Sequence, residues 1–462
     1  MIFTSSTFSF FLLIVFILYW SVPRRSVQNV MLLIASYLFY GWVHPWFCGL
    51  IALSTVIDYG CALGMEQQPR CRKRWLWLSL STNIGMLGGF KYFNFFADNV
   101  QLAFATIGIE AAPRVLDVVL PVGISFYTFQ TLSYTIDVYR GQLHARRNFV
   151  DFALFVAFFP QLVAGPIERA SHFLPQVERD RYWNTRRIFS AVPLILTGYL
   201  KKLVVADNVS VIVDRIFLLE QPPLFLLAVG SFGFAIQIFA DFSAYTDIAR
   251  ACARLLGFEL MENFRAPYLA ISPSDFWRRW HISFSSWIRD YVYIPLGGSK
   301  SESAWKAAWI LMVTMALSGL WHGAAWNFVV WGMFHGLLLT LYHAVGCGGR
   351  WYPASTLGRL SAWLTMQLLI VFGWALFRAP TLGWIFNAVW SAPFGVEGVS
   401  LVASSICFVT LVGYALPWVI AWVLERFRGE QEWELATCRW IQVGVIALLA
   451  NPNPQEFIYF QF

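Results

Sequence analysis

The fold of this chain is decided by residues 307–349, which read AAWILMVTMALSGLWHGAAWNFVVWGMFHGLLLTLYHAVGCGG. These 43 residues include no Asp, Glu, Lys or Arg, and an apolar run of this length is typical of membrane-spanning helices. The segment nevertheless contains His322, within Leu320-Trp321-His322-Gly323. An ionisable side chain inside a bilayer is costly and usually functional. His322 is therefore the first candidate for a functional residue.

The composition outside this segment also indicates a membrane protein. Hydrophobic residues make up 58% of the 462 and charged residues 13%, whereas soluble domains have roughly 25% charged residues. We predict an all-α, polytopic membrane protein with about 11 to 13 transmembrane or re-entrant helices, and one membrane-embedded domain over residues 1–462. The net charge of +7 comes from basic residues in short loops, which orient spans in a membrane, so we do not expect a nucleic-acid partner.

Hydropathy and charge breaks predict thirteen candidate spans. They lie near residues 3–20, 29–43, 46–64, 75–97, 115–137, 149–165, 188–206, 223–250, 307–320, 324–346, 360–378, 399–424 and 437–450. The basic loop at residues 70–74 should face the cytoplasm. Pro121-Val122-Gly123 and Ser318-Gly319 predict two interrupted helices, which are tolerated at membrane depth where they line a protein-buried cavity.

Residues 254–306 form a polar insert with a clear helix start. Ser272 is an N-cap residue, Pro273 suits the first helical position, and Asp275 completes a capping box. The spacing predicts one amphipathic helix over residues 273–291, with an aromatic stripe that includes Trp277 and Trp280 and with His281 inside it.

Two arginines of this helix admit two interpretations. Arg278 and Arg289 lie on one edge beside His281, where guanidinium groups could pair with phosphate oxygens of a donor. Together with Trp277 and Trp280 they are our predicted donor-binding residues. A tryptophan stripe flanked by arginines is equally typical of an interfacial membrane anchor.

The histidines admit alternatives as well. A neutral imidazole in low dielectric can act as a general base, and it can also be a core residue bonded to the backbone. We weigh both for His322 and favour the core interpretation for His335. The spacing of the histidines is not that of a metal site, so no metal is expected. The acids Asp58, Asp241 and Asp247 are expected to pair with arginines or hydroxyls.

The motifs resemble those of a known family. The segments that carry the resemblance are Asp275-Phe276-Trp277-Arg278-Arg279-Trp280-His281-Ile282-Ser283, Trp287-Ile288-Arg289-Asp290-Tyr291, Pro295-Leu296-Gly297-Gly298, Gly319-Leu320-Trp321-His322-Gly323, Met261-Glu262-Asn263-Phe264 and Phe457-Ile458-Tyr459-Phe460. They are similar to the membrane-bound O-acyltransferase family, in its bacterial branch for alginate and cellulose acetylation and teichoic acid D-alanylation. Ser318 stands where relatives often have a first glycine, and we expect little consequence.

The resemblance implies a crater-shaped helical bundle in the bacterial inner membrane. His322 falls at the family's catalytic histidine and His281 at the second position of its motif pair. The implied activity is transfer of an acetyl group from a cytoplasmic thioester, acetyl-CoA or another, toward a secreted exopolysaccharide, without a tightly bound cofactor. Implied partners are membrane lipids, a periplasmic acetyltransferase with a serine nucleophile, and a polysaccharide synthase or export complex. The alternatives are a transporter or flippase, or a scaffolding subunit, of such a complex.

Overall fold

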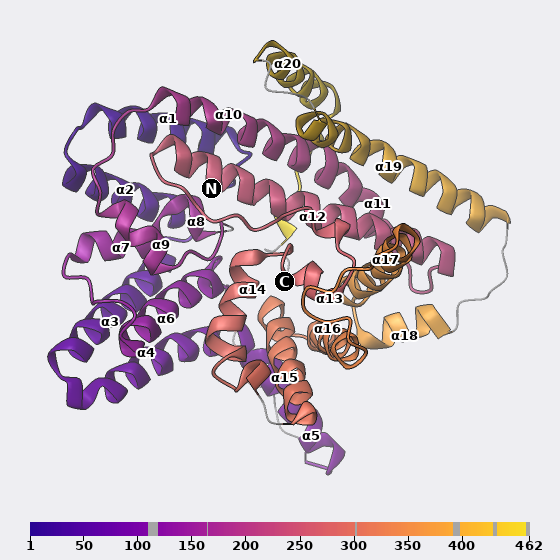
Figure 1. Cartoon of the computed structure of the whole chain (residues 1–462), viewed down its shortest axis with the longest axis horizontal. Helices are drawn as coiled ribbons and strands as arrows, with labels where there is room; N and C mark the ends of the chain where they lie inside the picture. The colour runs from indigo at the N-terminus through magenta and orange to yellow at the C-terminus, as the bar shows by residue number, and fades with distance from the viewer. Residues whose placement is uncertain (110–118, 164, 301–302, 391–397, 428–431, 459–462) are drawn as a thin grey trace. The chain divides into compact units, whose positions relative to one another are not determined.

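Helices form the described part of the chain throughout. The computed structural model describes residues 1–109, 119–163, 165–300, 303–390, 398–427 and 432–458, and these contain no β-strand (Figure 1). The all-α fold predicted from composition is confirmed. Parts of four sequence predictions lie outside the described residues, namely 115–118, 164, 301–302 and 459–460.

The chain packs as two compact units, each built from separated stretches of sequence. Unit 1 comprises Met1–Ala191 and Ala249–Met261, and unit 2 comprises Val192–Ile248 and Glu262–Phe462. The sequence did not predict this division.

The helices of unit 1 are α1 (Ser6–Ser21), α2 (Arg25–Tyr40), α3 (Phe47–Gln67), α4 (Arg72–Leu87), α5 (Phe93–Thr106), α6 (Ile124–Arg140), α7 (Phe149–Ala157), α8 (Phe159–Leu162) and α9 (Ala170–Val177). Those of unit 2 are the π-helical turn η3 (Leu200–Ala206), α11 (Asp207–Phe217), α13 (Pro273–Trp277), α14 (Ile282–Ile288), the π-helical turn η5 (Arg289–Tyr293), α15 (Ala304–His322), α16 (Trp326–Ala344), α17 (Thr356–Arg378), α18 (Leu382–Trp390), α19 (Gly398–Phe427) and α20 (Glu432–Leu449). Two helices, α10 (Thr185–Tyr199) and α12 (Leu224–Leu255), contribute residues to both units.

Six helical segments in the described part are long and apolar enough to cross a membrane. They are Phe47–Gln67, Thr185–Phe217, Leu224–Leu255, Ala304–His322, Thr356–Arg378 and Ser400–Leu424. Each of the thirteen predicted spans coincides with helical residues. Some predicted spans are nevertheless divided: α7 ends at Ala157 and α8 begins at Phe159. The chain is a multi-pass membrane protein.

Of the two predicted helix interruptions, the first lies partly outside the described residues and the second is wrong. Gly123 has φ 81° and precedes the first residue of α6, so a helix begins directly after Pro121-Val122-Gly123. By contrast, α15 continues through Ser318 and Gly319 and ends only at His322. A short connection then leads to α16, so that the two helices form a hairpin and lie side by side (Figure 1).

Gly319 serves close packing within this hairpin. A Cβ atom there would lie 2.0 Å from the Phe328 carbonyl oxygen, and a Cβ atom at Gly332 would lie 2.1 Å from the Met315 carbonyl oxygen. Small residues at such contacts let two membrane helices approach each other closely. The glycine therefore fixes how α15, which carries His322, sits against α16.

Hydroxyl and amide groups surround the buried Asp58 of unit 1. Its carboxylate accepts a hydrogen bond from Ser79 Oγ at 2.6 Å and two from Asn83 Nδ2 at 2.9 and 3.0 Å. All three side chains are fully buried. The expected pairing of Asp58 with hydroxyls is confirmed, and a buried polar network satisfied in this way is a structural feature of the bundle.

Two further acids, the buried Asp241 and the partly exposed Asp247 of unit 2, pair with lysines. Lys202 Nζ lies 3.0 Å from Asp241 Oδ1, and Lys201 Nζ forms an ion pair with Asp247. Each of the two acids thus has a lysine partner, whereas arginines or hydroxyls were expected. Both lysines belong to η3, and Lys202 also forms an ion pair with Asp207 at 2.8 Å.

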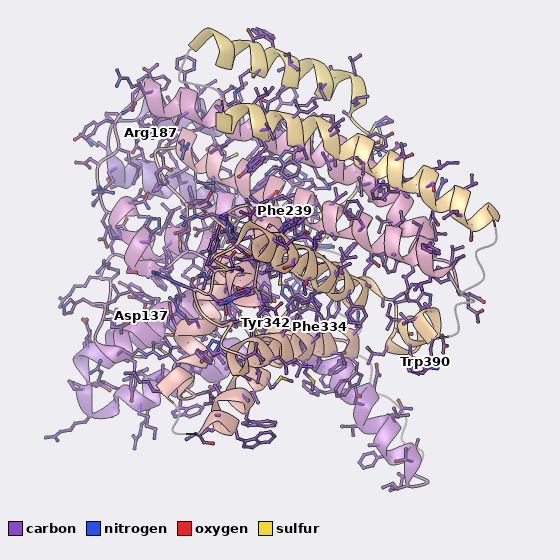
Figure 2. The ribbon with its side chains drawn as sticks, turned by 45° about the vertical axis from the view of Figure 1, so that its right-hand side comes forward. Asp137, Arg187, Phe239, Phe334, Tyr342 and Trp390 are labelled. Carbon is purple, nitrogen blue, oxygen red and sulfur yellow. The ribbon has the colours of Figure 1, made fainter. Side chains whose placement is uncertain are left out.

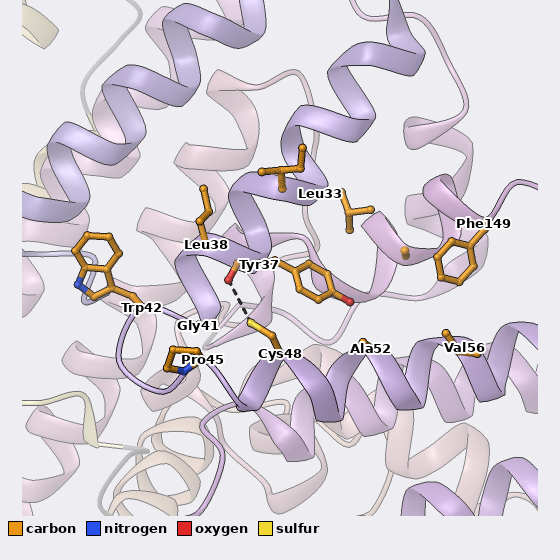
Figure 3. A pocket seen from close by; sticks show the side chains of 12 residues that line it. Leu33, Tyr37, Leu38, Gly41, Trp42, Pro45, Cys48, Ala52, Val56 and Phe149 are labelled. Atoms are coloured by element: carbon orange, nitrogen blue, oxygen red, sulfur yellow. Dashed lines mark hydrogen bonds between the residues drawn. The ribbon is translucent and has the colours of Figure 1, made fainter.

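An apolar groove of about 810 Å³ lies between α2 and α3 in unit 1 (Figure 3). A hydrogen bond crosses its floor, where Cys48 Sγ donates to the carbonyl oxygen of Tyr37 at 3.4 Å. Leu38 and Trp42 on its rim are exposed. The groove contains none of the residues predicted to act in catalysis or donor binding.

Candidate active site

A turn at residues 278–281 interrupts the long helix predicted over residues 273–291. The predicted helix start is confirmed, because Ser272 Oγ accepts a hydrogen bond from Asp275 N at 3.2 Å. The helix that begins there, α13, ends at Trp277. The chain resumes helical structure in α14 and η5, so the prediction of a single continuous helix is wrong.

The helix breaks because an earlier loop binds its backbone. Arg265 N donates to Arg279 O at 3.0 Å, and Ile282 N donates to Asn263 O at 2.9 Å. These bonds occupy backbone groups around the turn. His281 lies between them with φ 43°, the left-handed conformation that is unfavourable for a residue with a side chain. Strained backbone of this kind is concentrated at functional sites.

The hydrogen position on His281 follows from its contact with Asn263. Asn263 Oδ1 accepts hydrogen bonds from Ser283 N at 3.2 Å and Ser283 Oγ at 2.6 Å. A backbone N–H can only donate a hydrogen bond, so the side-chain atom of Asn263 that accepts from Ser283 N is the amide oxygen and not the amide nitrogen. His281 Nδ1 lies 3.4 Å from the same oxygen and therefore carries the hydrogen. The lone pair of the imidazole is left on Nε2.

Burial keeps this imidazole uncharged. The side chain of His281 has no exposed surface, and desolvation lowers its pKa from 6.5 to about 3. Within the described part of the chain, Nε2 is buried without a hydrogen-bond partner. His281 is thus a neutral ring with an available acceptor nitrogen.

His322 is the last residue of α15 and is 3% exposed. Aromatic rings surround it: the centroids of Trp321, Phe284, Trp331 and Phe377 lie 4.9, 5.5, 5.2 and 5.5 Å from its own. Such a shell excludes bulk water from the imidazole, which strengthens electrostatic interactions at the ring.

An aromatic pair brings the two predicted catalytic histidines together. Phe284 and Trp321 are stacked, with centroids 4.3 Å apart and planes inclined by 26°. The His281 centroid lies 5.0 Å from that of Phe284 and 6.0 Å from that of Trp321. Because both rings also contact His322, the two histidines share one aromatic wall.

A cavity of about 140 Å³ adjoins this wall. Its lining residues are Trp277, Phe284, Ser285, Ile288, Arg289, Tyr293, Leu311, Thr314, Met315, Ser318 and Leu339. Phe284 is thus shared between the cavity and His322. The cavity is bounded by α13, α14 and η5 on one side and by α15 and α16 on the other. A small ligand in it would lie next to the aromatic wall that the two histidines share.

Two of the four predicted donor-binding residues line this cavity. They are Trp277 and Arg289. The Arg289 guanidinium donates through Nε to Asp290 Oδ1 at 2.8 Å, and the side chain is 62% exposed. Its charge is therefore accessible at the cavity.

The other two predicted donor-binding residues, Arg278 and Trp280, are not among the residues that line this cavity. Arg278 Nη1 donates to Gly349 O at 2.6 Å. Trp280 is buried in an aromatic core, with its centroid 4.8 Å from Trp374 and 6.2 Å from Phe239, which is labelled in Figure 2. The predicted aromatic stripe and arginine edge required one straight helix, and the turn at residues 278–281 separates the residues before it from those after it.

The sequence did not single out Asn263 or Thr314 as site residues. Asn263 was noticed only as part of a motif, and no sequence pattern connects it with His281, eighteen positions away. Thr314 lies four residues before Ser318 on α15, which is a recognisable helical spacing. His335 packs against the rings of Trp277 and Trp331 at 5.2 and 4.8 Å, and its core interpretation stays a prediction. The described residues include no cluster of three or more potential metal ligands among His, Cys, Asp and Glu.

Comparison with known proteins places this site in a family. Residues 141–358, which include both histidines, match the membrane-bound O-acyltransferase family. A probable alginate O-acetylase of Azotobacter vinelandii is 40% identical over 83% of this chain and 76% of its own length. A probable alginate O-acetylase of Pseudomonas syringae pv. tomato is 38% identical over 85% of this chain and 75% of its own length. A peptidoglycan O-acetyltransferase of Helicobacter pylori is 33% identical over 84% of this chain and 77% of its own length.

These relatives are enzymes, and the similarity extends over most of the chain. The transporter, flippase and scaffold interpretations are therefore not favoured, and the acyltransferase interpretation is confirmed. The chain belongs to the membrane-bound O-acyltransferase family and is an O-acyltransferase.

Proposed function

We propose that this enzyme moves an acetyl group from a cytoplasmic thioester, acetyl-CoA, across the inner membrane for O-acetylation of a secreted exopolysaccharide. The observation that carries the proposal is the cavity that begins at the accessible Arg289 and includes Phe284, whose ring contacts His322. A donor bound through phosphate at Arg289 can extend its thioester toward the buried histidine. The relatives named for alginate and peptidoglycan acetylation support a polysaccharide acceptor.

His322 acts as the general base in this proposal. It accepts the proton of the attacking hydroxyl while the hydroxyl oxygen forms a bond to the thioester carbonyl carbon. The carbon–sulfur bond then breaks, and the thiolate takes the proton from the imidazolium. The products are an acetyl ester and a free thiol, so atoms and charge balance.

His281 is the second catalytic residue in this proposal. It orients the accepting group or stabilises the charge that develops on it. Its available Nε2 suits the first role, because it can accept a hydrogen bond from a hydroxyl group.

Trp277 lines the donor cavity with Arg289 in this proposal, whereas Arg278 supports the adjacent loop through Gly349. Trp280 holds the turn of His281 against the aromatic core.

The acceptor polymer is an alginate-like polysaccharide or cellulose. A periplasmic acetyltransferase with a serine nucleophile completes the final transfer, within a complex that contains the polysaccharide synthase or export proteins and the surrounding lipids.

The basic loop at residues 70–74 and the loop that contains Lys300 are expected to face the same, cytoplasmic side. The donor must reach the cavity from there, and the positive charges agree. Single cysteines placed at Lys73 and at Lys300, in a background without native cysteines, would be labelled with an impermeant maleimide in oriented vesicles. Labelling from opposite sides would contradict donor entry through the cavity.

Arg289→Lys is expected to raise the half-saturating donor concentration roughly ten- to hundredfold. A guanidinium pairs with phosphate through two parallel hydrogen bonds, and an ammonium does not reproduce this geometry. Arg265→Lys is the matched control, because Arg265 is similarly exposed and pairs with Glu262 instead. If Arg289→Lys lowers the melting temperature and leaves donor affinity unchanged, the segment is an interfacial anchor.

Asn263→Ala is expected to lower the transfer rate about tenfold, equivalent to about 1.4 kcal/mol of transition-state stabilisation. Its oxygen holds both Ser283 and the Nδ1–H of His281, and alanine would free the ring to change orientation. Asn263→Asp keeps an acceptor oxygen at the same place and should retain more activity. If Asn263→Ala and the unchanged enzyme have equal transfer rates at matched protein levels, Asn263 does not orient His281 for the reaction.

A further inference from the structure

The segment that follows α20 binds the π-helical turn η3 within unit 2. Asn451 N donates a hydrogen bond to the carbonyl oxygen of Leu203 at 2.9 Å, and Asn451 Nδ2 donates one to the carbonyl oxygen of Asp207 at 2.9 Å. Leu203 belongs to η3, and Asp207 is the residue directly after it. Single π-helical turns within α-helices are frequent at functional sites. The start of this segment is thus fixed to such a turn.

A carboxylate of α12 holds a later part of the same segment. Ile458 N donates a hydrogen bond to Asp241 Oδ2 at 2.7 Å, and Lys202 Nζ lies 3.0 Å from Asp241 Oδ1. Lys202 Nζ also donates to the carbonyl oxygen of Glu456 at 3.5 Å. Hydrogen bonds to an ionised carboxylate are stronger than those between neutral groups, and Phe457 and Ile458 are at most 1% exposed. Asp241 therefore anchors Phe457 in the interior of unit 2.

Aromatic contacts connect Phe457 with His281. Phe457 is stacked on Tyr245, with centroids 4.0 Å apart and planes inclined by 30°, and its centroid lies 5.9 Å from that of Phe242. Phe242 makes a T-shaped contact with the His281 imidazole, at 4.7 Å and 88°. Asp241 and Phe242 are consecutive residues of α12. The residue that binds the segment is thus next to the residue that contacts the histidine.

The orientation of His281 depends on packing as well as on Asn263. Its Nδ1 is 3.4 Å from Asn263 Oδ1, whereas a typical N–H···O hydrogen bond is about 2.7–3.2 Å long. A bond of this length constrains the ring only weakly. The centroids of Phe242 and Phe284 lie 4.7 and 5.0 Å from that of the imidazole. Contacts that hold Phe242 in place therefore also hold His281.

We infer that residues 456–458 form a positioning element of the active site, which keeps Phe457 against Phe242 and thereby keeps the His281 imidazole in one orientation. The inference rests on the proposed function, because it requires that His281 take part in acetyl transfer. Phe457, Phe242 and Asp241 are positioning residues, since they act on the reaction through His281. A small displacement of a reacting group can lower the rate greatly without a change in substrate binding.

Phe457→Leu tests this inference, because leucine keeps the position apolar and removes the flat ring that contacts Phe242. In inside-out membrane vesicles that contain the complete acetylation machinery, the maximal transfer rate should fall about tenfold. The half-saturating concentration of acetyl-CoA should not change, since Phe457 is not among the described residues that line the donor cavity. If the leucine variant does not accumulate, Phe457→Met replaces it, because methionine adapts to irregular space.

Phe217→Leu is the matched control. Phe217 is buried in the same unit and is stacked on Trp384, with centroids 5.4 Å apart, so its replacement removes a similar amount of packing. The maximal transfer rate should not change.

A double substitution separates an effect through His281 from a general loss of packing. Phe457→Leu should lower the maximal rate by less than about twofold in a His281→Asn enzyme, because two substitutions that act through one group are not additive. An equal factor in both backgrounds would overturn the inference. So would a rise in the half-saturating concentration of acetyl-CoA with an unchanged maximal rate.

The ring ¹⁵N shifts of His281 give a readout that does not depend on acetyl transfer. They are assigned in detergent-solubilised protein by comparison with His281→Asn. The unchanged protein should show one tautomer, with the hydrogen on Nδ1, and Phe457→Leu should show a mixture, because the tautomer follows the hydrogen bond to Asn263. A single Nδ1–H tautomer in Phe457→Leu would overturn the inference. The proposed function fails separately, if the unchanged enzyme transfers no acetyl group from acetyl-CoA while the tautomer responds as expected.

Discussion

His322→Ala is expected to abolish polymer acetylation while the protein still inserts and accumulates in the membrane. Loss of a general base removes about 10²- to 10⁴-fold of rate. The histidine is the last residue of α15, and the loss of a single buried side chain seldom prevents a protein from folding, so the variant should still insert. The measurement is the ester content of secreted polymer relative to the amount of enzyme in the membrane.

His343→Ala is the matched control for this substitution. His343 lies near the end of α16, is exposed and is outside the cavity. It should leave the ester content unchanged. Normal acetylation by His322→Ala at normal protein levels would exclude His322 as the base.

Gly319→Ala is expected to prevent accumulation of folded protein. The new methyl group would lie 2.0 Å from the Phe328 carbonyl oxygen, and the neighbouring atom belongs to the backbone, so a change of side-chain rotamer cannot relieve the contact. Overpacking usually costs about 1–3 kcal/mol, and a backbone contact this close should cost more. The amount of monodisperse protein after detergent extraction, together with its melting temperature, measures the effect.

The control for Gly319→Ala is Gly413→Ala in α19. A Cβ atom at Gly413 meets no heavy atom within 4 Å of the described structure, so the same change in composition should not lower stability. If both variants melt at the temperature of the unchanged protein, the close approach of α15 and α16 does not determine the fold.

The apolar patterns were sufficient to predict the class of fold, and they made His322 the first candidate for a functional residue. Membrane helices satisfy their own backbone groups, so hydropathy locates them without knowledge of their neighbours. The cost of an ionisable group in the membrane drew attention to His322 in the same way. A local signal also predicted the start of α13 after Ser272.

Long-range contacts explain what the sequence did not predict. The helix predicted over residues 273–291 is interrupted where Arg265 N donates a hydrogen bond to Arg279 O and Asn263 O accepts one from Ile282 N. No periodicity within the helix reveals such a partner outside it. Once the helix is broken, Trp280 no longer shares an aromatic stripe with Trp277, and Arg278 no longer shares an edge with Arg289. Ser318-Gly319 was interpreted as a break because glycine weakens helices, whereas its neighbour in space, Phe328, gives Gly319 a packing role.

The most direct test of the central claim uses sealed inside-out vesicles that hold the acceptor polymer and the periplasmic partner inside. Acetyl-CoA labelled in its acetyl group is added outside, at the cytoplasmic face. The account predicts labelled ester on the enclosed polymer with the unchanged enzyme, unlabelled coenzyme A remaining outside, and no labelled ester with His322→Ala. Labelled polymer in the His322→Ala vesicles, at the same rate as in vesicles with the unchanged enzyme, would contradict it.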